Sequence, residues 1–123
     1  MINVTNHPSS RWSEYQLEEA KAWGRDVITD IPFPVVPPAT CTEEVEQMAL
    51  NLAAAIVANG DTAVHLMGES GLVYATLSLL REKAEYIACL HSTTERQVVE
   101  QVGQDGTVTK TAVFNFVQFR AYW

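Results

Sequence analysis

Residues 62–71 read Thr-Ala-Val-His-Leu-Met-Gly-Glu-Ser-Gly, and this stretch decides which fold the chain is expected to adopt. Its first six residues are apolar on both faces apart from His65, which is typical of a buried strand in a parallel sheet. The glycine-bounded stretch that follows predicts a tight loop, and the apolar positions between residues 72 and 83 predict a helix. A strand, a tight loop and a helix in this order indicate one unit of an α/β fold.

Two more strand-and-helix units precede this stretch. Residues 2–5 predict the first strand and residues 26–31 the second, because both are rich in β-branched side chains. Four prolines between residues 32 and 38 then exclude regular structure. With a last strand expected over residues 86–90, the chain up to residue 96 predicts a β-α-β-α-β-α-β series with parallel strands.

The first two helices carry clear start and stop signals. In a capping box, a hydroxyl at the helix start accepts a hydrogen bond from a backbone N–H three residues later. The chain has two such boxes, and each predicted helix ends at a glycine. The second helix also has one apolar stripe, as a helix that packs on a sheet should have. The boxes are Ser13 with Gln16 and Thr40 with Glu43, the glycines are Gly24 and Gly60, and the stripe is Val45, Met48, Ala49, Leu52 and Ile56.

Residues 97–123 follow a different pattern. Two β-rich arms flank Asp105-Gly106, which is a strong signal for a hairpin turn. The second arm runs over residues 108–119, and its residues 113–119 are apolar on both faces for much of their length, so we expect an inner or covered strand with Phe114, Phe116 and Phe119 in the core. The predicted fold is thus a single α/β domain over residues 1–123, with a mostly parallel sheet, three crossover helices and a C-terminal β-hairpin.

The composition is that of one ordinary globular domain of 123 residues. The formal net charge is −7, with eight Lys and Arg against fifteen Asp and Glu, which disfavours binding to a DNA duplex. No apolar run is long enough to span a membrane and the first residues do not resemble a signal peptide, so we expect no membrane contact and a cytoplasmic location. Cys41 and Cys89 are too few for a disulfide framework.

Polar residues gather after three strands of the predicted sheet. Ligands of such sheets bind outside the carboxyl ends of the strands, so we expect the loops after the first, third and fourth strands to form one site. Backbone N–H groups at the start of the third helix are expected to receive a phosphate, although Glu69 would repel an anion there unless it acts on a proton or an adenine edge. This polar crest comprises Asn6, His7, Pro8, Ser9, Ser10, Arg11, Gly68, Glu69, Ser70, Gly71, His91, Ser92, Thr93, Thr94, Glu95 and Arg96.

Several of these side chains also have a purely structural interpretation. His65 lies in the middle of a strand and is expected to be a core histidine with its hydrogen bonds satisfied. His7 and His91 fit a ligand contact and a loop-holding hydrogen bond equally well. Ser70 fits a helix cap as well as a ligand contact. Trp12 alone among the tryptophans is close enough to the polar crest to stack on a base.

The chain lacks several common catalytic motifs. It has no G-x-x-x-x-G-K-[ST], G-x-G-x-x-G, H-E-x-x-H or G-x-S-x-G. No cysteine and histidine cluster has zinc spacing, and the acidic residues are not grouped as a two-metal site. We therefore expect no metal and no cofactor, and any catalysis is expected to be metal-independent.

Four strings of the chain resemble the CRISPR-associated Rossmann fold (CARF) family and the small stand-alone ring nucleases related to it. They are residues 3–8, 68–71, 92–96 and 115–120. The resemblance implies a Rossmann-like fold and a homodimer that binds a cyclic oligoadenylate across its interface. Since we see no effector domain, it also implies a ring nuclease that destroys this second messenger and switches off type III CRISPR signalling.

The implied reaction opens the ring, with cyclic tetra-adenylate as the expected substrate, and leaves 2′,3′-cyclic phosphate ends. A ribose 2′-OH attacks the neighbouring phosphate, so the protein has only to hold the in-line geometry and stabilise charge. Catalytic roles are expected for His7, Arg11, Glu69, His91 and Arg96. Ligand-binding roles are expected for Asn6, Ser9, Ser10, Trp12, Gly68, Ser70, Gly71, Ser92, Thr93 and Thr94.

Two other functions fit the same residues. A non-catalytic sensor would bind the cyclic nucleotide at the polar crest and pass the signal to a partner protein. A protein-interaction domain would have no nucleotide ligand and would use its acidic surface to bind a basic partner. The residues that bind a phosphate also stabilise its transition state, so both the sensor and the nuclease remain open at this point.

Overall fold

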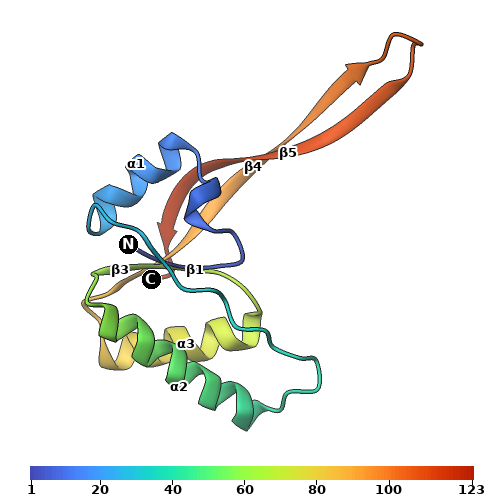
Figure 1. Ribbon diagram of the computed structural model, residues 1–123. Coiled ribbons are helices and arrows are strands. Elements are labelled where there is room, and N and C mark those ends of the chain that lie inside the picture. The colour runs from blue at the N-terminus through green and yellow to red at the C-terminus, as the bar shows by residue number, and fades with distance from the viewer.

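A five-stranded sheet in the order β2-β1-β3-β4-β5 runs through the computed structural model, which describes residues 1–123 (Figure 1). The strand pairs β1–β2, β1–β3 and β3–β4 are parallel, and β4–β5 is antiparallel. The predicted α/β class and the closing hairpin are therefore confirmed, whereas the prediction of a mostly parallel sheet fits in part, because the sheet is mixed and its longest ladder is antiparallel. The strands are β1 (Ile2–Val4), β2 (Thr29–Asp30), β3 (Ala63–Leu66), β4 (Ala88–Val102) and β5 (Val108–Ala121).

Helices cover both faces of this sheet. Helix α1 (Glu14–Trp23) lies on one face, and α2 (Thr42–Asn59) and α3 (Ser70–Lys83) lie on the other (Figure 1). The strand order reverses at β1, because β2 and β3 flank it on opposite sides. Right-handed crossovers that move in opposite directions along the sheet place their helices on opposite faces of it. None of the three helices has the length and hydropathy that a membrane-spanning segment needs.

Each face of the sheet has its own apolar core. The larger core lies under α2 and α3, where the predicted stripe of α2 buries Ala49, Leu52 and Ile56. The smaller core lies under α1 and includes Trp12 and Phe119. The helical periodicity of α2 thus predicted correctly which of its faces meets the sheet.

The helix caps agree with the sequence in one case and differ in the other. Ser13 caps α1, because its hydroxyl accepts a hydrogen bond from the N–H of Gln16. The predicted box at Thr40 is wrong, since α2 begins one residue later, after Cys41. The Cys41 thiol instead donates to a carboxylate oxygen of Glu44, 3.2 Å away. The Thr40 N–H belongs to the preceding proline turn and donates to the carbonyl of Pro37.

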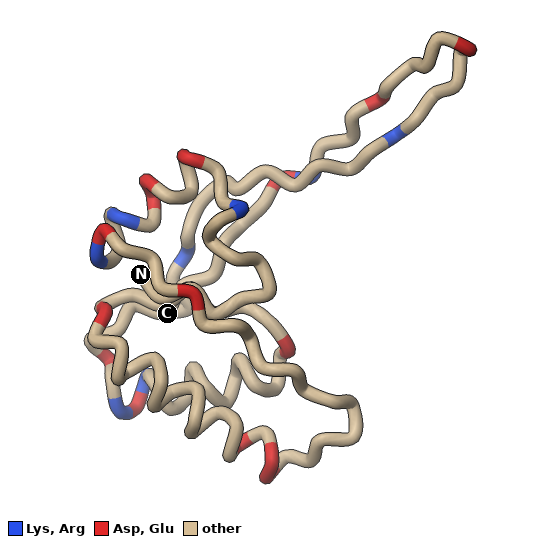
Figure 2. Tube along the Cα trace, viewed as in Figure 1, with Lys and Arg blue, Asp and Glu red and all other residues tan.

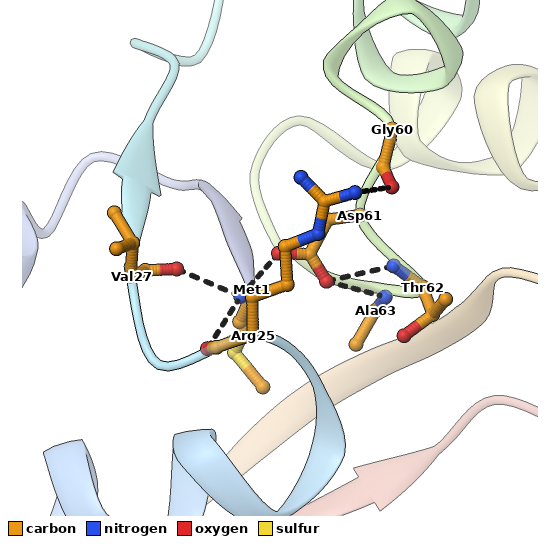
Figure 3. Close-up of polar contacts among 7 residues, drawn as sticks. All are labelled: Met1, Arg25, Val27, Gly60, Asp61, Thr62 and Ala63. Carbon is orange, nitrogen blue, oxygen red and sulfur yellow. Dashed lines mark hydrogen bonds and ion pairs between the residues drawn. The ribbon is translucent and has the colours of Figure 1, made fainter.

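The second strand is shorter than the predicted residues 26–31, because only Thr29 and Asp30 pair with β1. The carbonyl oxygens of Arg25 and Val27 turn instead toward the buried Met1 ammonium, at 3.4 and 3.1 Å (Figure 3). Residues 26–28 therefore wrap around the first residue and do not extend the ladder.

The Met1 ammonium also makes an ion pair with Asp61, at 2.7 Å between the nitrogen and Oδ2 (Figure 3). The other oxygen of this carboxylate accepts hydrogen bonds from the N–H groups of Thr62 and Ala63. Gly24 closes the cluster, because a Cβ on it would lie 2.7 Å from Asp61 Oδ1 and 2.8 Å from the Met1 nitrogen. Gly24 has an extended φ of −141°, so it serves close packing here and not a left-handed helix end.

The fourth strand is much longer than the predicted residues 86–90. Strand β4 continues through residues 91–96 as far as Val102, and it pairs with β5 along its length apart from a bulge between Thr93 and Thr94. The predicted hairpin turn is confirmed, with Gly106 in the left-handed region at a φ of 83°. From the turn, the antiparallel ladder continues past this bulge as far as Leu90 and Ala121, so residues 91–96 are strand and not loop.

The expectation that β5 is an inner or covered strand is wrong. It is the edge strand of the sheet, and the outer part of the hairpin projects beyond the helices (Figure 1). Phe119 is buried and Phe116 is half-buried, but Phe114 is 64% exposed. Only the base of the hairpin reaches the core under α1, so its outer apolar residues stay exposed.

Candidate functional site

A cavity of about 520 Å³ lies at the carboxyl ends of β1 and β3, where the strand order reverses. This is the position at which open α/β sheets bind ligands. A larger hollow of about 640 Å³ lies between α2 and α3, away from the strand ends, and its wall contains no histidine and no cation. The strand-end cavity is therefore the candidate site. Its lining residues are Thr5, Asn6, His7, Gln16, His65, Met67, Gly68, Ser92, Thr94, Phe114 and Phe116.

His65 lies in the wall of the strand-end cavity and is almost completely buried. Its Nδ1 is 3.0 Å from Asn3 Oδ1, and its Nε2 is 3.1 Å from Ser92 Oγ. Burial, together with the nearby His91 and His7, lowers the pKa of His65 to about 4. The ring is therefore neutral near pH 7, and the prediction of a core histidine with satisfied hydrogen bonds is confirmed.

Asn3 determines which nitrogen of His65 carries the proton. The Asn3 amide nitrogen donates to Asp30 Oδ1 at 2.7 Å and to the carbonyl of His7 at 3.0 Å. Both partners only accept, so the amide has one orientation and its oxygen faces His65. Since that oxygen also only accepts, Nδ1 of His65 must be the N–H, and Nε2 is left to accept from Ser92.

Asp30, at the end of β2, anchors this chain of hydrogen bonds. Its carboxylate also accepts from the backbone N–H of Ser9 at 3.0 Å and from the Ser9 hydroxyl at 2.7 Å. Burial alone would raise the pKa of Asp30, but the bonds from Asn3 and Ser9 outweigh it and lower the pKa. The hydroxyl of Ser9, which was predicted to bind a ligand, is thus already used to hold the loop after β1.

The polar residues predicted after the fourth strand are divided between the two faces of β4. Successive strand residues point to opposite faces, so Ser92 lines the cavity while His91 does not. His91 packs on Tyr122, with ring centroids 4.9 Å apart, and accepts a hydrogen bond from Arg120 at 3.2 Å. Burial lowers the pKa of His91, and Arg120 adds to this effect.

The two threonines that follow on β4 also differ from each other. Thr94 lines the cavity, as predicted for a ligand contact. The hydroxyl of Thr93 is buried without a hydrogen-bond partner and does not reach the cavity wall. Thr93 lies between Ser92 and Thr94, which both line the cavity, so strand alternation turns its side chain to the other face. The residue left without a cross-strand partner at the bulge is Val117 of β5.

The helix start after β3 is already occupied by its own carboxylate. Glu69 is the cap of α3, and its side chain accepts from the N–H groups of Leu72 at 2.8 Å and Gly71 at 2.9 Å. These bonds lower the pKa of Glu69. The expectation that Ser70 caps this helix is therefore wrong, and the N–H groups expected to receive a phosphate are not free. Of residues 68–71, only Gly68 lines the cavity.

Trp12 is buried beneath the site, so the expectation that it stacks on a base is wrong. Its ring packs edge-on against His65, with centroids 5.6 Å apart, and its Nε1 donates to the carbonyl of His7 at 3.3 Å. It therefore supports the cavity wall from inside. Two phenylalanines of the hairpin, Phe114 and Phe116, supply aromatic surface to the cavity in its place.

Arg11 and Arg96 are the two cations expected at the site, and neither makes a side-chain hydrogen bond or an ion pair. Arg96 is the cross-strand partner of Phe114, and directly opposed residues point to the same face of a sheet. Arg96 therefore stands beside the cavity wall. Arg11 and Ser10 are exposed in the short 3₁₀ turn η1 (Ser9–Arg11) that follows the cavity residue His7. Figure 2 shows no single face on which the basic residues gather.

The sequence missed several cavity residues, and Gln16 is the most informative of them. It lies on α1, is only 5% exposed and lines the cavity. Its side-chain amide makes no hydrogen bond with the protein, whereas its backbone N–H bonds to Ser13. The available signal was its spacing of four residues from the buried Ala20, which places both on the helix face toward the sheet.

The structure contains no group of three or more His, Cys, Asp or Glu side chains arranged to hold a metal ion. A family model described as "Uncharacterized protein MJ1673 family" matches residues 1–120. No curated protein matches the chain, and no solved structure does either.

Proposed function

We propose that this chain, which belongs to the MJ1673 family of uncharacterized proteins, binds a cyclic oligoadenylate at the strand-end cavity and opens its ring. The observation that carries the proposal is the cavity at the reversal of strand order. It is lined by hydroxyls, amides, histidines and phenylalanines, and it has the unpaired Arg96 beside it. The strand order β2-β1-β3-β4-β5 is also one of the doubly wound orders, which supports a Rossmann-like fold.

The cavity wall suits a nucleotide in two respects. Phe114 and Phe116 offer faces on which a base stacks, and such stacking contributes about 1–3 kcal/mol per base. Arg11 and Arg96 have no acidic partner that would neutralise them, so their charge is available to phosphates. The rest of the acidic surface disfavours long nucleic acids, which supports a small ligand.

His7 is the residue best placed to act on the ribose 2′-OH. It lines the cavity, and its side chain has no hydrogen-bond partner in the protein. Of the other candidates, Glu69 caps α3 and His91 packs on the opposite face of β4. In the proposed reaction His7 takes the 2′-OH proton as the 2′-oxygen attacks phosphorus, the 5′-oxygen leaves, and solvent protonates it.

The products of this reaction are linear oligoadenylates with 2′,3′-cyclic phosphate ends. The nucleophile belongs to the substrate, so the protein holds the in-line geometry and stabilises charge without a metal. Removal of this second messenger would switch off type III CRISPR signalling, which is a cytoplasmic role.

Turnover of labelled cyclic tetra-adenylate tests the proposal directly. We expect linear products with cyclic phosphate ends, at a rate that EDTA does not change. His7→Ala is expected to lower the rate by roughly 100-fold or more, the usual contribution of a general base. Arg96→Ala is expected to weaken binding, and Lys83→Ala is its matched control, because Lys83 is also a cation without a partner but lies at the far end of α3. Binding without turnover would select the sensor function. If the protein neither binds nor cleaves the cyclic nucleotide, both the nuclease and the sensor functions are overturned.

We also propose that the protein acts as a homodimer in which the hairpins of two copies meet. The outer part of the hairpin exposes Phe114 and valines of both strands, and β5 is an unpaired edge strand. Proteins usually cover such an edge or place charges on it. A cavity of about 520 Å³ suits a ligand of drug size, and a cyclic tetranucleotide is larger. The face that carries Phe114 continues the cavity wall, so a second copy placed there would bring two cavities together.

Light scattering of the purified protein tests the dimer. We expect the mass of two chains, and we expect Val98→Lys to give the mass of one. Val98 is 54% exposed and shares the face of Phe114, because Ala112 lies opposite Val98 and two residues before Phe114. Val99→Lys is the matched control, since Val99 points to the other face and this variant should stay dimeric. A monomeric wild type would contradict the proposal.

A further inference from the structure

A side-chain amide without a protein partner lines the strand-end cavity. Gln16 is only 5% exposed and its side chain makes no hydrogen bond with the protein, but its amide atoms remain accessible to solvent. A ligand in the cavity would therefore replace the water that solvates this amide. The amide presents a donor and an acceptor side by side, which matches the edge of a nucleic-acid base.

Ser92 presents a second polar atom to the same cavity, and its hydroxyl has a fixed direction. Nε2 of His65 carries no proton, because the hydrogen bonds that begin at Asp30 and pass through Asn3 place the ring proton on Nδ1. The Ser92 hydroxyl therefore donates to Nε2, 3.1 Å away.

One other acceptor competes for this proton, the sulfur of Met67 at 3.3 Å. A thioether is a weak acceptor, and this sulfur already receives the backbone N–H of Ser92 at 3.4 Å. With its proton directed at His65, Ser92 Oγ has only lone pairs left for the cavity. A ligand atom that meets Ser92 must therefore be a donor.

The order Ser92, His65, Asn3 also matches that of a nucleophile, a base and the group that orients the base. The pKa of His65, at about 4, argues against that role, because a base works best when its pKa is near the working pH. His65 and Asn3 are therefore positioning residues that fix the Ser92 hydroxyl.

We propose that Gln16 and Ser92 select adenine as the base of the bound nucleotide, an inference that rests on the proposed function of the cavity. Adenine has an exocyclic amine beside a ring nitrogen, and a glutamine amide pairs with both. The amine has a second hydrogen, which Ser92 Oγ accepts. Hypoxanthine has an oxygen where adenine has the amine. Gln16 reads either base by turning its amide over, so the fixed acceptor at Ser92 makes the distinction.

Binding of paired ligands tests this selection. Calorimetry with cyclic tetra-adenylate and its inosine counterpart should show a preference for adenine of about tenfold or more in wild type, as expected for one polar contact to a base. Ser92→Ala should remove most of this preference, whereas Gln16→Leu should weaken the binding of both ligands equally. Ser78→Ala is the matched control, because its hydroxyl bonds to the carbonyl of Tyr74 on α3, far from the cavity.

The nitrogen NMR shifts of His65 test the fixed direction without any ligand. We expect a protonated Nδ1 and a bare Nε2 at neutral pH. In the opposite tautomer Nε2 would donate to Ser92 Oγ, and the Ser92 hydroxyl would be free to donate to a ligand in the cavity. That result would overturn the inference. His65→Leu removes the acceptor of the Ser92 proton and should relax the preference for adenine; its melting temperature is measured first, and Ser92→Ala serves if this variant does not fold.

A comparison of adenosine and inosine 5′-monophosphates separates this inference from the proposed function. If the adenosine nucleotide shifts the Gln16 amide resonances and the inosine nucleotide does not, the pocket selects adenine even where no ring is opened. If the ring is cleaved with equal affinity for both bases, the cavity is a ring-nuclease site and the roles assigned to Gln16 and Ser92 are wrong.

Discussion

Replacing Asp61 with alanine is expected to lower the free energy of unfolding by about 3–5 kcal/mol, the usual cost of leaving one charge of a buried ion pair alone. The Met1 ammonium and the Asp61 carboxylate are both almost completely buried (Figure 3). Burial alone would raise the pKa of Asp61, but the bonds from the Met1 ammonium, Thr62 and Ala63 outweigh it and lower the pKa. Urea unfolding near neutral pH measures the difference.

Two further variants identify the source of this loss. Asp61→Asn keeps an oxygen for the N–H groups of Thr62 and Ala63 but turns an amide NH2 toward the Met1 ammonium, so it should lose both the charge pairing and the hydrogen bond from the ammonium. Glu18→Gln removes one carboxylate from the exposed pair with Lys21 and should have no measurable effect. The protein must carry Met1 as its first residue in this experiment, because a tag would turn the ammonium into an amide. Equal stability of the wild type and Asp61→Ala would show that the pair contributes nothing.

Acidification is expected to destabilise the protein through His65, by about 2 kcal/mol between about pH 7 and pH 5 and by about 3 kcal/mol at about pH 4. Burial holds the pKa of His65 at about 4 in the folded protein, against an ordinary value of 6.5. As the pH falls below about 6.5, the unfolded chain binds a proton at this residue and the folded protein does not. Stability therefore falls until the pH reaches the folded pKa, below which both states bind the proton.

The groups around His65 support this pH window. Asn3 and Ser92 are uncharged partners, Trp12 and Phe119 pack on the ring, and His7 and His91 act only by lowering its pKa. Asp30 and Asp61 have lowered pKa values, so they hold their stabilising effect above an ordinary value of 3.8 and lose it at still lower pH.

Urea unfolding at several pH values is the measurement, with His65→Gln and His91→Gln compared with wild type. His65→Gln has no titrating ring and should remove most of the slope between about pH 6.5 and pH 4. His91→Gln should keep most of it. An unchanged slope in His65→Gln would show that other groups cause the acid sensitivity.

The site was only partly predictable, because residues 91–96 belong to a strand that the sequence did not reveal. Side chains of a strand alternate between the two faces of the sheet, so only some of these residues reach the cavity. Residues 91–96 look like a polar loop, since hydroxyls and charges follow the apolar residues 86–90. The register of β4 with β5 makes them strand, which sends His91 and Ser92 to opposite faces. Glu69 caps α3 in place of Ser70, because the carboxylate at residue 69 reaches two N–H groups of α3.

No local motif showed that the other cavity residues meet at the site. Phe114 and Phe116 reach the cavity because β5 pairs with β4, which itself pairs with β3, and Gln16 reaches it because α1 packs on the same face. Asp30 was read as an ordinary strand residue, yet it anchors the hydrogen bonds that set the His65 proton. These relations join residues far apart in sequence, so they depend on contacts that periodicity does not describe.

The sequence by itself determined the order of elements, the apolar face of α2, the cap of α1, the hairpin turn and the buried state of His65. Each of these depends on neighbouring residues, on helical or strand periodicity, or on a local hydrogen bond. Only the tertiary structure decided the length of β4, the exposed edge position of β5 and the membership of the strand-end cavity. Residues 62–71 illustrate both, because their pattern predicted a buried strand, whereas the direction of the His65 hydrogen bonds depends on partners from β1, β2 and β4.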